Sequence, residues 1–227
     1  MLNITAVAPD LKIMPGANPP KMPNEIIEIV DRIWQAETAE RGSTLFNGPI
    51  FSVENISPSI ITGWISEYKF FLAQRRHAEL FNALHVRPLA LTGLLLCQEG
   101  VVIGRRSGNV EQDAGLWELV PSGGIDGITN PDGSIDLNAH LMNELLEETG
   151  IRPENVSNPI PFALIEDTES HVCDISLALR TKLSRQEIFA IFYRLANREY
   201  TQLEVVPTLQ LTEVKVTPVS RTILKLA

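Results

Sequence analysis

The chain has 227 residues, of which 44% are hydrophobic and 21% charged, and its formal net charge is −9. This composition predicts a globular protein with one large domain, or one domain with a sizeable extension. The sequence has no basic tract for a nucleic-acid groove, no apolar run of membrane-spanning length and no signal-peptide pattern, so we expect neither nucleic-acid nor membrane partners. Two cysteines, Cys97 and Cys173, are too few for a disulfide framework, and we expect a reducing, cytoplasmic environment.

The first third of the chain predicts a small mixed α/β unit. Residues 1–22 are rich in proline, so we expect an extended arm there. Apolar residues recur at helical spacing over 23–41, which predicts a helix. Strands are expected at 48–57 and 61–73, joined by a Ser-Pro-Ser turn, and a short helix at 75–84.

A second domain is expected to begin where a nearly continuous apolar run predicts a buried strand. We therefore divide the chain into an arm with an α/β extension, residues 1–86, and a main domain, residues 87–227. Ser184 and Glu187 form a capping-box pattern at the start of one helix of this domain. The expected elements are strands at 88–97 and 101–107, a glycine-rich loop in 115–127, a helix at 137–149, strands at 161–167 and 174–183, a helix at 184–200, short strands near 203–206 and 213–216, and a terminal helix at 220–227.

The helix at 137–149 places three carboxylates on one side. Leucine and methionine side chains cover one face, while Glu144, Glu147 and Glu148 share a separate arc of roughly 100°. Gly150 suits the left-handed turn that ends a helix. Mutual repulsion and the helix dipole both oppose this placement of acids. Two interpretations follow: a solvated acidic face, or a site for a hard cation such as Mg²⁺ or Mn²⁺.

The segment "NELLEETGI" (143–151), with "PSGG" upstream, resembles the Nudix box, G-x5-E-x7-R-E-U-x-E-E-x-G-U, in which U is a bulky apolar residue. The strand ending in "GRRS" and the segment "GLWELVPSGG" also look like that family's approach to its box. The resemblance implies the Nudix fold, an α/β (α+β) architecture in which a mixed β-sheet is sandwiched between helices, here with a small N-terminal α/β extension.

Two features depart from the family pattern. Asn143 stands at the position of the box arginine. Gly123 lies 21 positions before Glu144 where the pattern has 15, so six residues are inserted, and the first box glutamate falls on Ile135 or Thr129. In the family these missing residues mainly brace the loop and the helix. Asp126 and Asp132 are the candidates to compensate.

The resemblance implies Mg²⁺-dependent hydrolysis of a nucleoside diphosphate linked to another group, with Mn²⁺ as a substitute. Glu144, Glu147, Glu148 and the backbone carbonyl of Gly124 would hold the ions, which neutralise the diphosphate and lower the pKa of the attacking water. The general base stays open among Glu144, Glu166 and Glu204.

Further candidates surround the box. Gly123 and Gly124 would approach the substrate, and Arg105 and Arg106 could clamp phosphates, with surface ion pairs as the alternative for each arginine. His140 and Trp117 more often have packing roles, and the two cysteines look like buried strand residues.

The substrate is predicted from sequence segments that lie outside the part resembling the Nudix box. Within the family the chain resembles the UDP-sugar pyrophosphatases over about residues 28–206, in "LFNGPIF", in "RRS", in the lengthened segment after the glycines and in "NPIPFALIEDTES". This implies cleavage of UDP-glucose or UDP-galactose to UMP and hexose 1-phosphate. An ADP-ribose or other nucleotide-sugar pyrophosphatase and a non-catalytic nucleotide-sugar-binding protein are the alternatives. The N-terminal unit would help to shape the nucleotide pocket or a homodimer interface.

Overall fold

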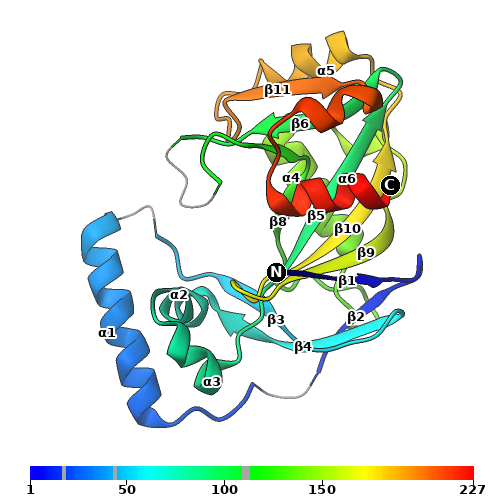
Figure 1. The fold of residues 1–227 in the computed structure, drawn as a ribbon. Helices are drawn as coiled ribbons and strands as arrows, with labels where there is room; N and C mark the ends of the chain where they lie inside the picture. Colours follow the sequence, from blue (N-terminus) through cyan, green and yellow to red (C-terminus); the bar gives the residue numbers. More distant parts are fainter. Residues whose placement is uncertain (17–18, 43–44, 109–112) are drawn as a thin grey trace.

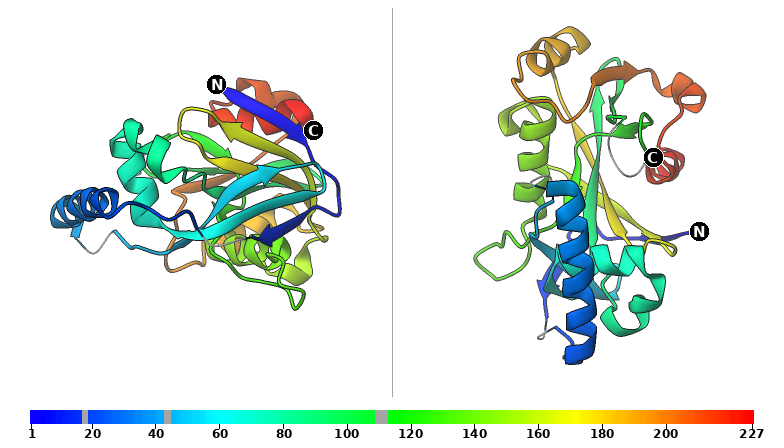
Figure 2. Two further views of the ribbon diagram at one scale, coloured as in Figure 1. Left: turned by 90° about the horizontal axis from the view of Figure 1, so that it is seen from below. Right: turned by 90° about the vertical axis from the view of Figure 1, so that its left-hand side faces the viewer.

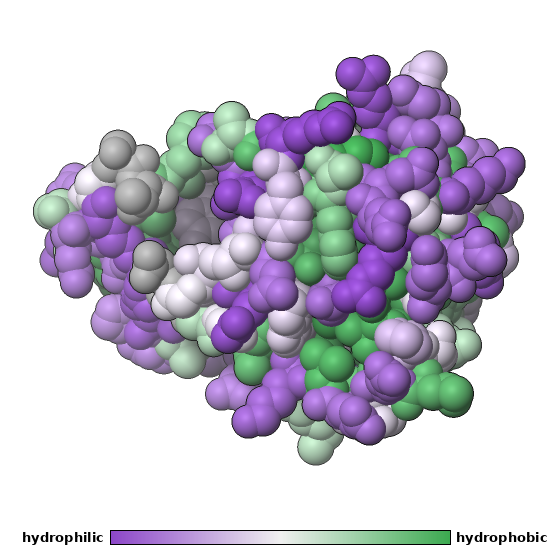
Figure 3. All heavy atoms as spheres, turned by 90° about the horizontal axis from the view of Figure 1, so that it is seen from above, coloured by the Kyte–Doolittle hydropathy of each residue, from purple (hydrophilic) through white to green (hydrophobic). Residues whose placement is uncertain are grey.

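A computed structural model describes residues 1–16, 19–42, 45–108 and 113–227 (Figure 1). Two β-sheets and their flanking helices make up the molecule, with helix α1 at the lower left of Figure 1 and the smaller sheet below the larger one. Within these ranges no helix combines the length and the apolar character needed to cross a bilayer. On the face seen in Figure 3, hydrophilic side chains surround scattered hydrophobic ones.

The large sheet has eight strands and carries the acidic helix. Its main path runs β1-β9-β10-β5-β6-β11, with β7 paired to β6 and β8 paired to β5. Strands β10 and β5 are parallel, and every other pair in this sheet is antiparallel. The strands are β1 (Leu2–Ala6), β5 (Leu89–Cys97), β6 (Gly100–Arg105), β7 (Trp117–Leu119), β8 (Ser122–Gly124), β9 (Ile160–Asp167), β10 (Cys173–Arg180) and β11 (Gln202–Val206).

Helices cover both faces of this sheet. In the right-hand view of Figure 2, α4 (Leu137–Thr149) lies on one side and α6 (Pro218–Leu226) on the other. Because side chains alternate along a strand, Leu91 and Leu95 of β5 enter the core shared with α4 and α5 (Arg185–Phe192), whereas Leu94 enters the core beneath α6. The expected mixed sheet sandwiched between helices is therefore confirmed.

The small sheet orders its strands β2-β4-β3, with β2 and β4 parallel and β3 and β4 antiparallel. A separate core of Val30, Phe71 and Leu84 holds its helices together. The elements are β2 (Lys12–Pro15), α1 (Asn24–Arg41), β3 (Pro49–Ile56), β4 (Ile60–Glu67), α2 (Tyr68–Arg76), η2 (Ala78–Leu80) and α3 (Phe81–Leu84).

The N-terminal segment connects the two sheets. Residues 1–22, expected as an extended arm, contain two strands, of which β1 pairs with β9 of the large sheet and β2 with β4 of the small one. A division of the chain at residue 86 therefore leaves one strand of the large sheet in the N-terminal part.

Three predicted elements differ from the observed ones. The strand expected at 61–73 ends at Glu67, because Phe71, Leu72 and Ala73 are buried as part of helix α2. The helix expected at 184–200 ends at Phe192, although its predicted capping box is present. No strand occupies 213–216, where a 3₁₀ helix, η4 (Thr208–Glu213), is followed by a single bridge between Trp117 and Val216.

Candidate active site

Helix α4 is fixed at both ends and along one face. The side chain of Asp136 accepts a hydrogen bond from the backbone N–H of Ala139, which caps the N-terminus. Gly150 ends the helix in the left-handed conformation, with φ of 75°. The side chains of Leu141 and Leu145 are fully buried against the sheet. These contacts aim the acidic side of the helix at strand β8.

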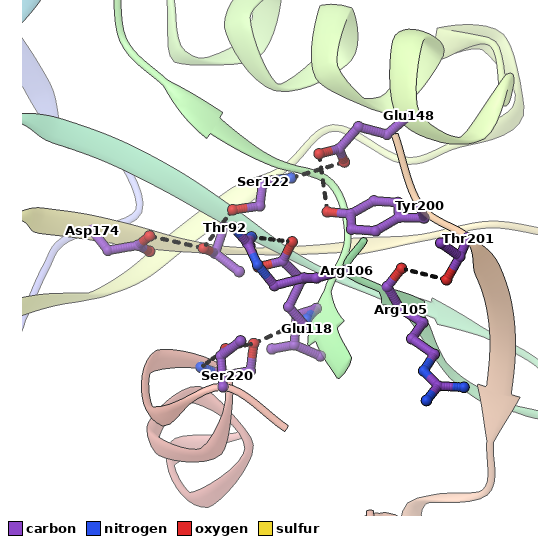
Figure 4. Close-up of polar contacts among 12 residues, drawn as sticks. Thr92, Arg105, Arg106, Glu118, Ser122, Glu148, Asp174, Tyr200, Thr201 and Ser220 are labelled. Carbon is purple, nitrogen blue, oxygen red and sulfur yellow. Dashed lines mark hydrogen bonds and ion pairs between the residues drawn. The ribbon is translucent and has the colours of Figure 1, made fainter. Parts of the chain in front are cut away.

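Glu148 is the most enclosed of the three acids, with 1% of its surface exposed. The backbone N–H of Ser122 donates to its Oε2 at 3.1 Å, and the Tyr200 hydroxyl donates to its Oε1 at 3.0 Å (Figure 4). Burial, followed by the charge of Glu199, raises the pKa of Glu148 well above its usual value despite both donors. The charges that act on Glu148 come from other acids, which disfavour its charged form.

Glu144 and Glu147 lie on the same side of α4 but differ in exposure. Glu144 is half-buried, and its carboxylate lies so close to Gly123 that a Cβ there would overlap it. Burial, followed by the nearby Glu147 charge, raises the pKa of Glu144 to about 7. Glu147 itself is exposed. The structure therefore brings Glu144 and Glu148 against β8, whereas Glu147 faces solvent at the edge of this site.

The donor set suits a hard cation only in part. Within the described ranges, no three His, Cys, Asp or Glu side chains are already gathered closely enough to hold an ion. Mg²⁺, however, binds through one or two carboxylates and keeps several waters or substrate oxygens. The charge of Glu144 is among the causes that raise the pKa of Glu148, so the two carboxylates lie within electrostatic reach of each other. Two carboxylates match the number that Mg²⁺ takes from a protein, and Glu147 is exposed on the same helix.

The two glycines of β8 have different surroundings. Gly123 pairs with Leu91, and a Cβ at this position would require the Glu144 carboxylate to move. Gly124 pairs with Ala90, is exposed, and has open space where a Cβ would stand. Its exposure leaves the predicted role of its carbonyl as a ligand sterically open.

The two arginines at the end of β6, Arg105 in the strand and Arg106 directly after it, have different surroundings. Nη1 of Arg106 lies 2.6 Å from the carboxylate of Glu118, which is 8% exposed. Burial raises the pKa of Glu118, and the Arg106 charge opposes that effect. Arg105 is exposed, and its Nε donates to the backbone carbonyl of Gly115 at 3.5 Å. Arg106 is thus tied to an internal acid, while Arg105 is accessible from solvent.

A second polar cluster lies beside β8 (Figure 4). The Thr92 hydroxyl donates to Oδ2 of Asp174 at 2.8 Å and lies 3.4 Å from the Ser122 hydroxyl. Burial raises the pKa of Asp174 to about 7. Among the described residues its Oδ1 has no hydrogen-bond partner. This cluster places a buried carboxyl group with a raised pKa on the α6 side of the sheet.

The two later acids considered as general bases are held by arginines. Glu204 on β11 forms an ion pair with Arg185 and also accepts the backbone N–H of Val205. Glu166 on β9 lies 2.6 Å from Nη2 of Arg87. The hydrogen bonds and ion pairs of the described residues link neither acid to Glu144 or Glu148.

Packing roles account for His140, Trp117 and Cys173. His140 is 4% exposed, and its Nε2 accepts the backbone N–H of Ile128 at 3.2 Å. Trp117 is half-buried against the core beneath α6. Cys173 is buried on β10, whereas Cys97 is only half-buried at the end of β5.

The lengthened segment after the glycines rests on the N-terminal unit. The backbone N–H of Ile135 donates to the carbonyl of Ile13 on β2 at 2.8 Å, and Lys12 pairs with Asp132 at 3.1 Å. The backbone N–H of Phe51 on β3 donates to Ile125 at 2.7 Å, immediately after the glycines. The small sheet thus supports the loop at two points.

A cavity of about 400 Å³ lies between the N-terminal helices, the β9–β10 hairpin and the start of α6. Asp113 and Pro218 form one of its walls, and Pro218 begins α6, which lies on the opposite face of the large sheet from α4. On another wall, Phe81 stacks on His171 with ring centroids 3.5 Å apart. The lining residues are Gln74, Arg75, Ala78, Phe81, Asp113, Asp167, Glu169, Ser170, His171 and Pro218.

Sequence patterns missed Tyr200, the Ser122 amide and the Thr92–Asp174 pair. Tyr200 was placed inside a helix that in fact ends at Phe192. The one available signal for Asp174 was an acid at the start of an otherwise apolar strand, because a buried carboxyl group needs a specific partner. A backbone amide has no sequence signal.

No protein-family model and no curated protein matches this chain. Among solved structures, a Nudix hydrolase from M. smegmatis, RenU, is 15% identical, with 61% of this chain and 82% of that one covered and a TM-score of 0.42. MutT Nudix hydrolase from Burkholderia pseudomallei is also 15% identical, covering 60% and 95%, with a TM-score of 0.43. Shewanella oneidensis NrtR is 15% identical, covers 60% and 59% with a TM-score of 0.41, and has also been solved with a 27-mer DNA. All three scores lie below 0.5, so these similarities establish neither the family nor the activity of this chain.

Proposed function

We propose that this chain is a Mg²⁺-dependent hydrolase of the Nudix type that cleaves the pyrophosphate bond of a nucleoside diphosphate sugar. The observation that carries the proposal is the meeting of Glu144 and Glu148 with strand β8, where one carboxylate lies against Gly123 and the other accepts the Ser122 amide. A structural acidic face would turn its carboxylates to solvent, whereas Glu148 is almost completely buried.

The residues of the chain would divide the work as follows. Glu144 and Glu148, with Glu147 and the Gly124 carbonyl at the rim, would hold the ion, which supplies Lewis-acid chemistry to water and diphosphate. Arg105, exposed at the end of β6, would meet a phosphate oxygen. Glu144 is the favoured general base, because its half-buried carboxylate lies against strand β8, where the attacking water would be held. Glu204 and Glu166 are less suited, since arginines stabilise their charged forms.

UDP-glucose or UDP-galactose is the proposed substrate, cleaved to UMP and hexose 1-phosphate. The support for this substrate is the similarity of segments outside the acidic helix, such as "LFNGPIF" and "NPIPFALIEDTES", to the UDP-sugar pyrophosphatases.

A substrate panel with Mg²⁺ tests the proposal. UDP-glucose, UDP-galactose, ADP-ribose, GDP-mannose and a nucleoside triphosphate would be incubated separately with the full chain, and the products separated by chromatography. Release of UMP and hexose phosphate from the UDP-sugars is expected. Turnover confined to ADP-ribose would replace the proposed substrate while keeping the reaction. Binding of a UDP-sugar without any product would identify a non-catalytic binding protein instead.

A further inference from the structure

We infer that Tyr200 is a positioning residue for Glu148, with its hydroxyl fixing the carboxylate in the orientation that binds a divalent ion. This inference rests on the proposed function, because it concerns the same metal site. Tyr200 is 1% exposed, and its hydroxyl donates to Oε1 of Glu148 at 3.0 Å. The Ser122 amide holds the other oxygen at 3.1 Å. Two donors from separate segments therefore define the plane of the carboxylate.

The position of Tyr200 is itself well determined. Its ring packs over Gly104 of β6, where an added Cβ would lie 2.6 Å from Cγ of the ring. The next residue, Thr201, donates through its backbone N–H to the carbonyl of Arg105 at 3.0 Å and through its hydroxyl at 3.2 Å. A ring fixed on the sheet and a backbone fixed to β6 leave the hydroxyl little freedom. Such rigidity is what a residue needs to orient a ligand.

The tyrosine also fills a role that helix α4 cannot supply from its own sequence. Asn143, the residue directly before Glu144, is exposed and carries no charge. Glu148 takes its hydrogen bonds from outside the helix, one from β8 and one from the segment after α5. Both donors are neutral, so they orient the carboxylate without neutralising it. Its affinity for a cation is thereby preserved, whereas an arginine would have competed with the ion.

The experiment compares Tyr200→Phe with Tyr193→Phe, which removes the same hydroxyl from an exposed ring on the solvent side of α5. Mn²⁺ alone would be titrated into each full-length protein by calorimetry, without nucleotide. Tyr200→Phe is expected to weaken Mn²⁺ binding about tenfold, as is typical when a residue that orients a ligand is lost. Tyr193→Phe should bind as the wild type does. Wild-type affinity in Tyr200→Phe would overturn the inference and leave the proposed hydrolase intact.

A double variant separates positioning from simple packing. If Tyr200 acts through Glu148, adding Tyr200→Phe to Glu148→Gln should weaken Mn²⁺ binding no further. Additive losses would mean that the tyrosine influences the site by another route and would contradict the inference. Absence of any Mn²⁺ binding by the wild type would remove the metal site itself, and with it both this inference and the proposed function. UDP-sugar turnover by the wild type distinguishes that outcome from the others.

Discussion

The acids of helix α4 and the acids of strands β9 and β11 have opposite electrostatic surroundings. Glu166 and Glu204 each meet an arginine, so their charge is balanced within the chain. Glu148 meets an amide and a phenol, and the charges that act on it come from other acids, Glu199 and Glu144. An acid that pairs with an arginine needs no further partner in the folded protein, whereas an acid without such a partner is stabilised by an external cation. The comparison thus separates structural acids from those suited to a ligand.

The largest expected effect is loss of activity when Glu148 is neutralised. Glu148→Gln removes the charge and keeps one oxygen, which can accept from the Ser122 amide, while its NH₂ group can donate to the Tyr200 hydroxyl oxygen. We expect kcat on the proposed substrate to fall roughly a hundred- to a thousandfold. Thermal unfolding without metal should change little or move upward, because the pKa of Glu148 shows that its charge is disfavoured in the fold. Steady-state kinetics and calorimetric unfolding provide the measurements, and retained turnover would place Glu148 among the structural acids.

Asp174 predicts a pH dependence of stability. Its pKa is raised to about 7 by burial, so the folded protein keeps the proton after the unfolded chain has released it. As pH rises from about 4 to about 7, deprotonation stabilises the unfolded state relative to the folded state. The free energy of unfolding therefore falls across that window. The contribution of Asp174 alone would be on the order of 4 kcal/mol. Urea unfolding in EDTA at several pH values measures it.

Asp174→Asn should flatten this decline, because an amide neither ionises nor loses the hydrogen bond from Thr92. Some slope should remain, since burial also raises the pKa of Glu144. Asp10→Asn, at an exposed position, is the matched control and should keep the wild-type profile. An unchanged slope in Asp174→Asn would mean that this carboxyl group ionises normally in the folded protein.

A smaller effect is expected from a change that touches neither acid nor metal. Gly104→Ala would place a Cβ against the Tyr200 ring and displace it from Glu148. We expect Mn²⁺ affinity to fall about tenfold, as for loss of the hydroxyl itself. Gly108→Ala, where a Cβ meets open space, is the control. Equal affinities of the two variants would show that the ring position does not control the carboxylate.

The sequence predicted the secondary-structure elements better than the tertiary contacts between them. Helix α4 matches its expected range of 137–149, because a periodic apolar face, a capping aspartate and a terminal glycine all act locally. The strand expected at 61–73 was wrong after Glu67, since burial against α1 makes those aromatic residues helical. Propensity yields to such tertiary contacts. The same limit applies to the long helix expected up to residue 200.

The residues of the candidate site were likewise predictable where they depend on local sequence and not where they depend on distant contacts. Glu144, Glu147 and Glu148 followed from spacing on one helix, which is a local property. The partners of Glu148 come from β8 and from the segment after α5, far apart in the chain. The pairing of Glu204 with Arg185 was equally hidden, because it depends on where α5 begins relative to β11. The sequence therefore indicated which acids share a helix face, but not which acids of the chain already form an ion pair with an arginine.

The smallest effect is expected from neutralising an acid that already has an arginine partner. Glu204→Gln keeps a side-chain oxygen for the Val205 amide and removes only the charge that Arg185 neutralises. If an internally paired acid takes no part in the chemistry, kcat on a UDP-sugar should stay within about twofold of the wild-type value, because a solvent-accessible ion pair contributes little. Parallel kinetics with Glu148→Gln make the two acids directly comparable. A loss in Glu204→Gln as large as that in Glu148→Gln would mean that Arg185 releases this carboxylate when substrate binds, and the general base would then be assigned to β11 instead of α4.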